Sequence, residues 1–299
     1  MRSGLELPMN SYVLALCANL SFAIGSQFFT HFTRLFSSTW VNCFKAIVAS
    51  IAFCLTVLLS TGFHNISIEV FSIFLLSGAI GLGVGDIFLL KAFGEIGPGR
   101  SMVIFGFHPI VIGIISYFLF AQELDFYKLW GIIFFMICLF IFSLESFKES
   151  GNWKIKGLLF AFLGMLLDAA GVLLTRFAFD QNSSITPLEG NFHRCIGALI
   201  VYVCLRPFWP FQFQSRLKSM SKASLWLLLI GTFFGTYLSL SLYLKSIQIA
   251  DNLALISSIS ITSVLFSSLI ECIWERKMPS RYLILSLISF SFGMYFIFK

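Results

Sequence analysis

The stretch SGAIG at residues 77–81 returns, with changed apolar side chains, as GTFFG at residues 231–235. Both copies lie inside long apolar segments and carry a small residue at each end. Both also run on to a Leu-Lys pair, at residues 90–91 and 244–245, so the offset between the copies is 154 residues. Internal similarity at this distance predicts two structurally equivalent halves.

A second pair of segments supports the repeat. Asn42 is followed three residues later by Lys45, and Asn191 is followed three residues later by Arg194. Each pair lies in an apolar segment. An amide and a cation therefore recur together in both halves, where each is costly to place in lipid.

The composition predicts that lipid is the solvent for most of the chain. Hydrophobic residues make up 58% of the sequence and charged residues 11%, and Phe alone occurs 37 times. The mean hydropathy is +0.91. A soluble fold cannot hide this much apolar surface, so we predict a polytopic helical membrane protein.

Apolar runs of about 20 residues predict ten transmembrane helices. Five crossings per repeat insert the second repeat in the opposite direction, so we predict an all-α integral membrane protein of two inverted five-helix repeats, residues 1–150 and 151–299. The short opening lacks a cleavage site after its first apolar run, and we expect that span to be retained. The expected spans are 9–29, 38–60, 69–92, 99–121, 127–145, 157–178, 190–205, 223–244, 251–273 and 281–298.

Two cations inside the spans are candidates for a substrate site. A charge at the centre of a lipid-embedded helix costs about 2.5–3.5 kcal/mol on insertion scales, so it must face a partner or a cavity. Lys45 and Arg194 could snorkel to headgroups or bridge two helices. Their matching repeat positions favour a positive cavity lining, with Asn42 and Asn191 beside them, that attracts an anionic group of a substrate.

Three further polar residues are expected at the same depth. Asp168 lies about 16 Å into the sixth span at 1.5 Å per residue, and Asp86 follows the glycine run of the third span. Carboxylates in a low dielectric take up protons more readily, so both are candidates for proton coupling, although Asp168 could instead bond a neighbouring Ser or Thr. His108 precedes Pro109 in the middle of the fourth span, where proline kinks a membrane helix. It is either a pore residue or a satisfied core histidine.

Other chemistries lack support in the sequence. The seven cysteines lie in apolar segments and form no CxxC pair, so we expect no metal site, disulfide framework or redox pair. Catalytic motifs and a Walker loop are missing, so we expect neither an enzyme nor an ATP-driven pump, and no cofactor. The formal net charge of +6 is explained by loop cations facing anionic headgroups, and nucleic-acid binding is not expected.

The chain resembles the EamA-type carriers of the drug/metabolite transporter superfamily. The resemblance rests on the ten spans, the run GDIFLLKAF at residues 85–93, Gly97, Pro109 and the acidic residues Glu123 and Glu275 that follow the fourth helix of each half. In this family a glycine usually precedes that acid; here Gln122 and Trp274 stand in its place. The resemblance implies a carrier with a central cavity between its repeats, and cations in the second helix of each repeat that match Lys45 and Arg194.

We therefore expect a secondary transporter of a small metabolite, an amino acid or a related compound with an anionic group, that works by alternating access and exports its substrate. The alternative is a membrane interaction or scaffold protein without transport activity. The compact loops are typical of a bacterial inner membrane. Loop cations predict that both termini lie outside, whereas the resemblance implies cytoplasmic termini. Substrate identity, coupling ion and oligomeric state stay open.

Overall fold

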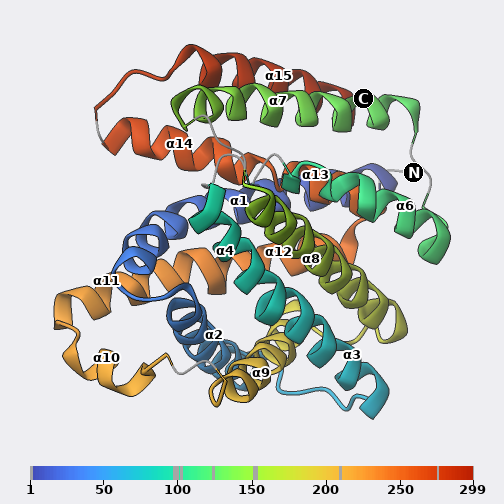
Figure 1. Cartoon of the computed structure of the whole chain (residues 1–299). Coiled ribbons are helices and arrows are strands. Elements are labelled where there is room, and N and C mark those ends of the chain that lie inside the picture. Colours follow the sequence, from blue (N-terminus) through green and yellow to red (C-terminus); the bar gives the residue numbers. More distant parts are fainter. Residues whose placement is uncertain are drawn as a thin grey trace.

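The computed structural model describes residues 3–96, 101, 104–122, 125–150, 154–208, 211–274 and 276–298. Within these residues the regular structure is helical and contains no strand, so the expected all-α class is confirmed. Figure 1 shows the helices stacked in several layers. They are α1 (Ser3–Leu35), α2 (Ser38–Ser60), α3 (Ile68–Gly78), η1 (Ala79–Gly85), α4 (Asp86–Ile96), α6 (His108–Phe120), α7 (Phe126–Ser150), α8 (Ile155–Gln181), α9 (Pro187–Leu205), α10 (Phe213–Ser219), α11 (Lys222–Thr232), η2 (Phe233–Leu238), α12 (Ser239–Ile249), α13 (Leu253–Ile259), α14 (Thr262–Trp274) and α15 (Arg281–Phe298).

Nine helical segments in the described part of the chain are long and apolar enough to cross a bilayer. Their outward faces carry large apolar side chains, such as Leu59, which is 86% exposed, and Phe118, which is 79% exposed. Lipid is the solvent that makes such exposure favourable. The chain is therefore an integral, multi-pass membrane protein.

The expected fourth span differs from the others. Of residues 99–121 only His108–Phe120 forms a described helix with apolar character, and it is 13 residues long. A turn at residues 106–107 precedes it. His108 and Pro109 therefore begin α6, and the expected kink in the middle of a continuous helix is wrong. Proline fits the first helical turn because no intrahelical partner exists there for the amide hydrogen that it lacks.

The expected ninth span is interrupted in a similar manner. A turn at residues 260–261 separates α13 from α14. This turn lies 154 residues after the turn at residues 106–107, the same offset that relates the repeated sequences. Two helices of the fold are thus discontinuous at corresponding positions, and at such breaks backbone groups become free to bond other partners.

The repeated glycine stretches form π-helix. The span Ile68–Ala92 contains η1 between α3 and α4, and the span Lys222–Ile249 contains η2 between α11 and α12. Ala79 and Phe233 begin these segments, again 154 residues apart. π-helical turns inside α-helices are rare and frequently occur at functional sites.

Helices from the two halves of the sequence pack against one another. α2 lies against α9, α15 against α7, α1 against α12, and α8 against α4; Figure 1 shows α15 running beside α7. Glycines permit close approaches between these helices. A Cβ atom on Gly25 of α1 would overlap the backbone of Gly235 in η2, and one on Gly171 of α8 would lie 3.1 Å from Cα of Gly81 in η1.

Candidate functional site

Five ionisable side chains from five helical segments meet where the two halves pack together. Lys45 comes from α2, Asp86 from the start of α4, His108 from the start of α6, Asp168 from α8 and Arg194 from α9. These helices pack in a connected set, α2 on α4 and α9, and α8 on α4 and α6. All five residues were expected from the sequence, and the structure brings them into one cluster.

Lys45 and Asp86 form one side of the cluster. The Nζ atom of Lys45 lies 3.9 Å from Oδ2 of Asp86 and donates a 3.1 Å hydrogen bond to Oδ1 of Asn42, one turn earlier on the same helix. The ammonium also lies 4.6 Å from the ring centroid of Phe29 on α1. The lysine is thus held by a carboxylate, an amide and an aromatic face.

Asp168 and His108 form the opposite side. Oδ2 of Asp168 lies 3.1 Å from Nε2 of His108. The helix break at residues 106–107 produces this contact, because it places His108 at the start of α6. Asp168 is located in the middle of α8, yet 37% of its side chain is accessible. The carboxylate contacts His108 of α6 and interacts with the charge of Arg194 on α9.

Arg194 is the most enclosed member of the cluster, with 2% of the residue exposed. Its Nε atom donates a 3.1 Å hydrogen bond to Oγ of Ser77. Its charge also interacts with the carboxylates of Asp168 and Asp86. Nη1 of Arg194 is buried and has no hydrogen-bond partner within the described residues. A buried guanidinium nitrogen without an acceptor favours an anionic ligand, since such a group is costly to leave unpaired.

Small residues let the guanidinium approach Asp168. A Cβ atom on Gly81 would lie 3.8 Å from Nη2 of Arg194 and 4.0 Å from Oδ1 of Asp168. The π-helical turn that contains Gly81 therefore lies beside the charged groups of both Arg194 and Asp168. Any side chain larger than glycine at this position would occupy the space beside them.

The charges of the cluster balance. Two cations, Lys45 and Arg194, face two carboxylates, Asp86 and Asp168, and the carboxylates are the more accessible pair. The side chains of Asp86 and Asp168 are 30% and 37% accessible, whereas that of Lys45 is 14% accessible. A ligand could therefore reach the two carboxylates more easily than it could reach the ammonium group of Lys45.

The two asparagines that were expected beside the cations have different environments. Asn42 bonds Lys45 and belongs to the cluster. Asn191 is fully buried, and its Nδ2 atom donates a 2.8 Å hydrogen bond to the carbonyl oxygen of Leu240. The contacts of Asn191 therefore connect α9 to α12 and do not join it to the charges.

Sequence reasoning missed the polar residues that hold Arg194 and Asp168. Ser77 receives the bond from Arg194 and lies 2.7 Å from both Oγ1 of Thr175 and the carbonyl oxygen of Gly171. Tyr243 interacts electrostatically with Asp168 and Arg194. Ser77 and Tyr243 both lie in the repeated stretches of sequence, and this repetition could have identified them as candidates. Among the described side chains no group of three or more His, Cys, Asp or Glu residues could hold a metal ion.

Comparison with known families finds a match for the first part of the chain. Residues 9–144 match the model of the EamA-like transporter family. This part of the chain is EamA-like. The resemblance that the sequence indicated is thereby confirmed over these residues, which include Lys45, Asp86 and His108. The family's acidic positions, Glu123 and Glu275, and Gly97 lie outside the described residues.

The chain also shares its fold with a protein of known crystal structure. The two structures superpose with a TM-score of 0.74 over 97% of this chain and 96% of the other, at 12% sequence identity. This likeness concerns the fold and covers both halves. No curated protein sequence matches the chain.

Proposed function

We propose that the protein is a secondary carrier that moves a small zwitterionic metabolite, of the amino-acid kind, across its membrane. The observation that carries the proposal is the charge-balanced cluster of Lys45, Asp86, Asp168 and Arg194. It joins residues from both halves of the sequence, deep inside the helices. The match of residues 9–144 to a transporter family supports transport over catalysis.

The cluster matches a substrate with one positive and one negative end. An ammonium group would face the accessible carboxylates of Asp86 and Asp168. A carboxylate would face Lys45 and the unpartnered Nη1 atom of Arg194, since guanidinium groups bind carboxylates through paired hydrogen bonds. A substrate with only an anionic group would leave two carboxylates facing it, so the anionic group that the sequence predicts is better placed in a zwitterion.

The proposal includes alternating access between two inverted five-helix repeats, residues 1–150 and 151–299. Three observations support this division. The π-helical segments correspond in the two halves, the helix breaks correspond as well, and helices of one half pack against helices of the other. Discontinuous helices near the middle of the membrane are the usual sites of substrate and ion binding in such carriers. His108 begins one of them and contacts Asp168.

The same cluster suggests proton coupling. Asp168 and Asp86 are the proposed coupling residues, and a proton on either carboxylate would mimic the charge of a bound ammonium group. Binding of substrate and binding of proton would then compete, which is the requirement for exchange across the membrane. We place the carrier in a bacterial inner membrane and expect net export.

Solute counterflow in proteoliposomes tests the proposal whichever ion is coupled to transport. Vesicles that contain the purified protein are loaded with one unlabelled compound at a time, and uptake of the labelled compound is followed. We expect accumulation with one or more zwitterionic amino acids and none with sugar phosphates or nucleotide sugars. Absence of counterflow with every compound, from protein that is folded and inserted, would favour an interaction protein without transport activity.

A further inference from the structure

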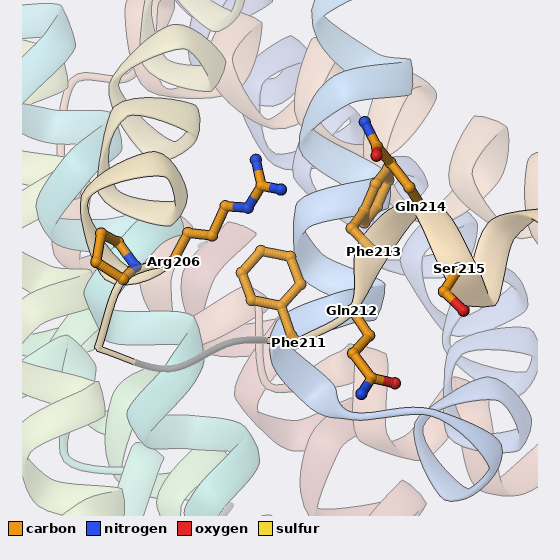
Figure 2. A pocket seen from close by; sticks show the side chains of 7 residues that line it. Arg206, Phe211, Gln212, Phe213, Gln214 and Ser215 are labelled. Carbon is orange, nitrogen blue, oxygen red and sulfur yellow. The ribbon is translucent and has the colours of Figure 1, made fainter.

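A pocket outside the charge cluster lies in the connection between α9 and α11. Its volume is about 500 Å³, and Figure 2 shows the side chains that line it. They come from the connection that follows α9 and from the short helix α10. The lining residues are Arg206, Pro207, Phe211, Gln212, Phe213, Gln214 and Ser215.

Arg206 supplies the charge of this pocket. In Figure 2 its guanidinium extends past the ring of Phe211 toward the side on which Phe213 and Gln214 lie. The residue is exposed, and no described carboxylate forms an ion pair with it. Gln214 and Ser215 add an amide and a hydroxyl, which can donate hydrogen bonds to the same ligand.

The surrounding sequence carries positive charge only. No acidic residue occurs between Glu189 and Asp251, whereas Arg206, Arg216 and Lys218 fall within this interval, together with Lys222. A ligand in the pocket therefore experiences attraction from several cations and no repulsion from the same segment of chain. The expected ligand is an anion.

The position of the pocket identifies the kind of anion. α9 and α11 are both membrane-spanning, and Arg206 follows the last residue of α9 directly. Phe208 is 87% exposed and Trp226 is 67% exposed, as aromatic residues are where headgroups meet acyl chains. The indole nitrogen of Trp40 on α2 donates a 3.2 Å hydrogen bond to the carbonyl oxygen of Phe213, which holds the connection against the bundle.

We propose that this pocket binds the phosphate of an anionic lipid headgroup. Arg206 grips the phosphate through parallel hydrogen bonds, Gln214 and Ser215 donate further bonds, and the acyl chains lie against the apolar surface beside Phe208. Basic pockets next to membrane-spanning helices are typical headgroup sites. The proposal is independent of the transported substrate, because none of these residues belongs to the charge cluster.

Native mass spectrometry of the detergent-purified full chain tests the proposal. The probes are phosphatidylglycerol and phosphatidylcholine with identical acyl chains, and the variants are Arg206→Gln and Lys218→Gln. Lys218 carries the same charge in the same connection but does not line the pocket. We expect wild type and Lys218→Gln to retain phosphatidylglycerol over phosphatidylcholine, and Arg206→Gln to lose about tenfold in that preference, the effect of one charge-assisted hydrogen bond.

Three results would overturn the assignment. Equal loss in both variants would mean that diffuse charge attracts the lipid. Equal retention of phosphatidylglycerol and phosphatidylcholine by wild type would mean that the protein does not distinguish the two headgroups. Inorganic phosphate at millimolar concentration could displace phosphatidylglycerol and raise the melting temperature of the protein as much as the lipid does. That result would assign the pocket to soluble phosphate. Arg206→Lys, which keeps the charge, checks folding and is expected to recover part of the preference.

Discussion

Nε2 of His108 lies 3.1 Å from Oδ2 of Asp168, and this contact joins the start of a broken helix in the first half of the chain to the middle of an unbroken helix in the second. The carboxylate lies between His108 and Arg194 and is partly accessible. Asp168 is therefore the residue whose removal affects the proposed site most directly.

We predict that Asp168→Asn lowers counterflow at least about tenfold while the protein remains folded. The amide keeps the shape of the side chain but loses the charge that would face an ammonium group, and charged hydrogen bonds contribute about 1.5–3 kcal/mol. Initial rates in proteoliposomes measure the effect. The control is Asp180→Asn on the same helix, near its end, where the carboxylate pairs with Arg176. Wild-type rates in Asp168→Asn would exclude this carboxylate from the site.

The ion pair between Lys45 and Asp86 predicts non-additive mutants. Lys45→Met leaves the carboxylate of Asp86 without its cation, and we expect a loss of about 1–3 kcal/mol in the free energy of unfolding. The double variant Lys45→Met with Asp86→Asn removes both charges, and we expect it to be more stable than the single lysine variant. Thermal unfolding in detergent gives the comparison. Strictly additive changes would show that the two charges do not interact.

Gly78 and Gly81 form a matched pair on the third span. A Cβ atom on Gly78 would overlap the backbone around the carbonyl of Arg194, whereas one on Gly81 would meet its nearest atom, Cα of Gly171, at 3.5 Å. We expect Gly78→Ala to force α3 and α9 apart and to cost about 1–3 kcal/mol or more of stability. Gly81→Ala should fold normally. Size-exclusion profiles and melting temperatures distinguish the two, and an equally stable Gly78→Ala would contradict the packing.

Gly81 offers a second measurement on the site itself. Because its Cβ position lies beside Arg194 and Asp168, we expect Gly81→Val to lower counterflow about tenfold or more by filling the space that a substrate needs. The same uptake assay applies, with Gly81→Ala as the smaller step. Normal transport by folded Gly81→Val would place the substrate elsewhere.

Glu189 predicts a stability effect outside the cluster. Its fully buried carboxylate accepts a 3.0 Å hydrogen bond from the backbone amide of His64 and lies 2.8 Å from Nδ1 of the same residue. Glu189→Ala leaves that amide without its acceptor, and we expect a loss of about 1–3 kcal/mol. Glu69→Ala is the control, because Glu69 also occupies the first turn of a helix but is exposed. Equal melting temperatures for the two variants would contradict the assigned role.

Much of the architecture could be predicted because lipid imposes simple rules on the sequence. Apolar runs of the right length mark spans, and a charge inside a span must meet a partner, so Lys45, Asp86, Asp168 and Arg194 could be selected from their positions alone. The offset of 154 residues pointed to matching local structure in the two halves. Which charges would pair with which could not be predicted, since that depends on the order in which the helices pack.

The hydropathy of the sequence does not predict local backbone geometry. The turn before His108 lies inside an apolar run, and a run of apolar letters cannot show where a helix breaks. For the same reason the π-helical segments were visible only as glycine-rich stretches. Asn191 was grouped with Arg194 by sequence spacing, but its side chain points to Leu240, and a spacing of three residues does not determine which neighbour a side chain meets.

The π-helical segment η1 fixes the direction in which Asp86 points. An α-helix turns by about 100° per residue, so a helix that accommodates one extra residue rotates everything after it by that angle. Deleting one residue between Ala79 and Gly85 would let the segment close into ordinary α-helix and turn the whole of α4, Asp86 included, toward a different neighbour. The number of residues in this segment therefore matters for function. Loss of a single codon here would turn the carboxylate of Asp86 away from Lys45, although every charged side chain would still be present.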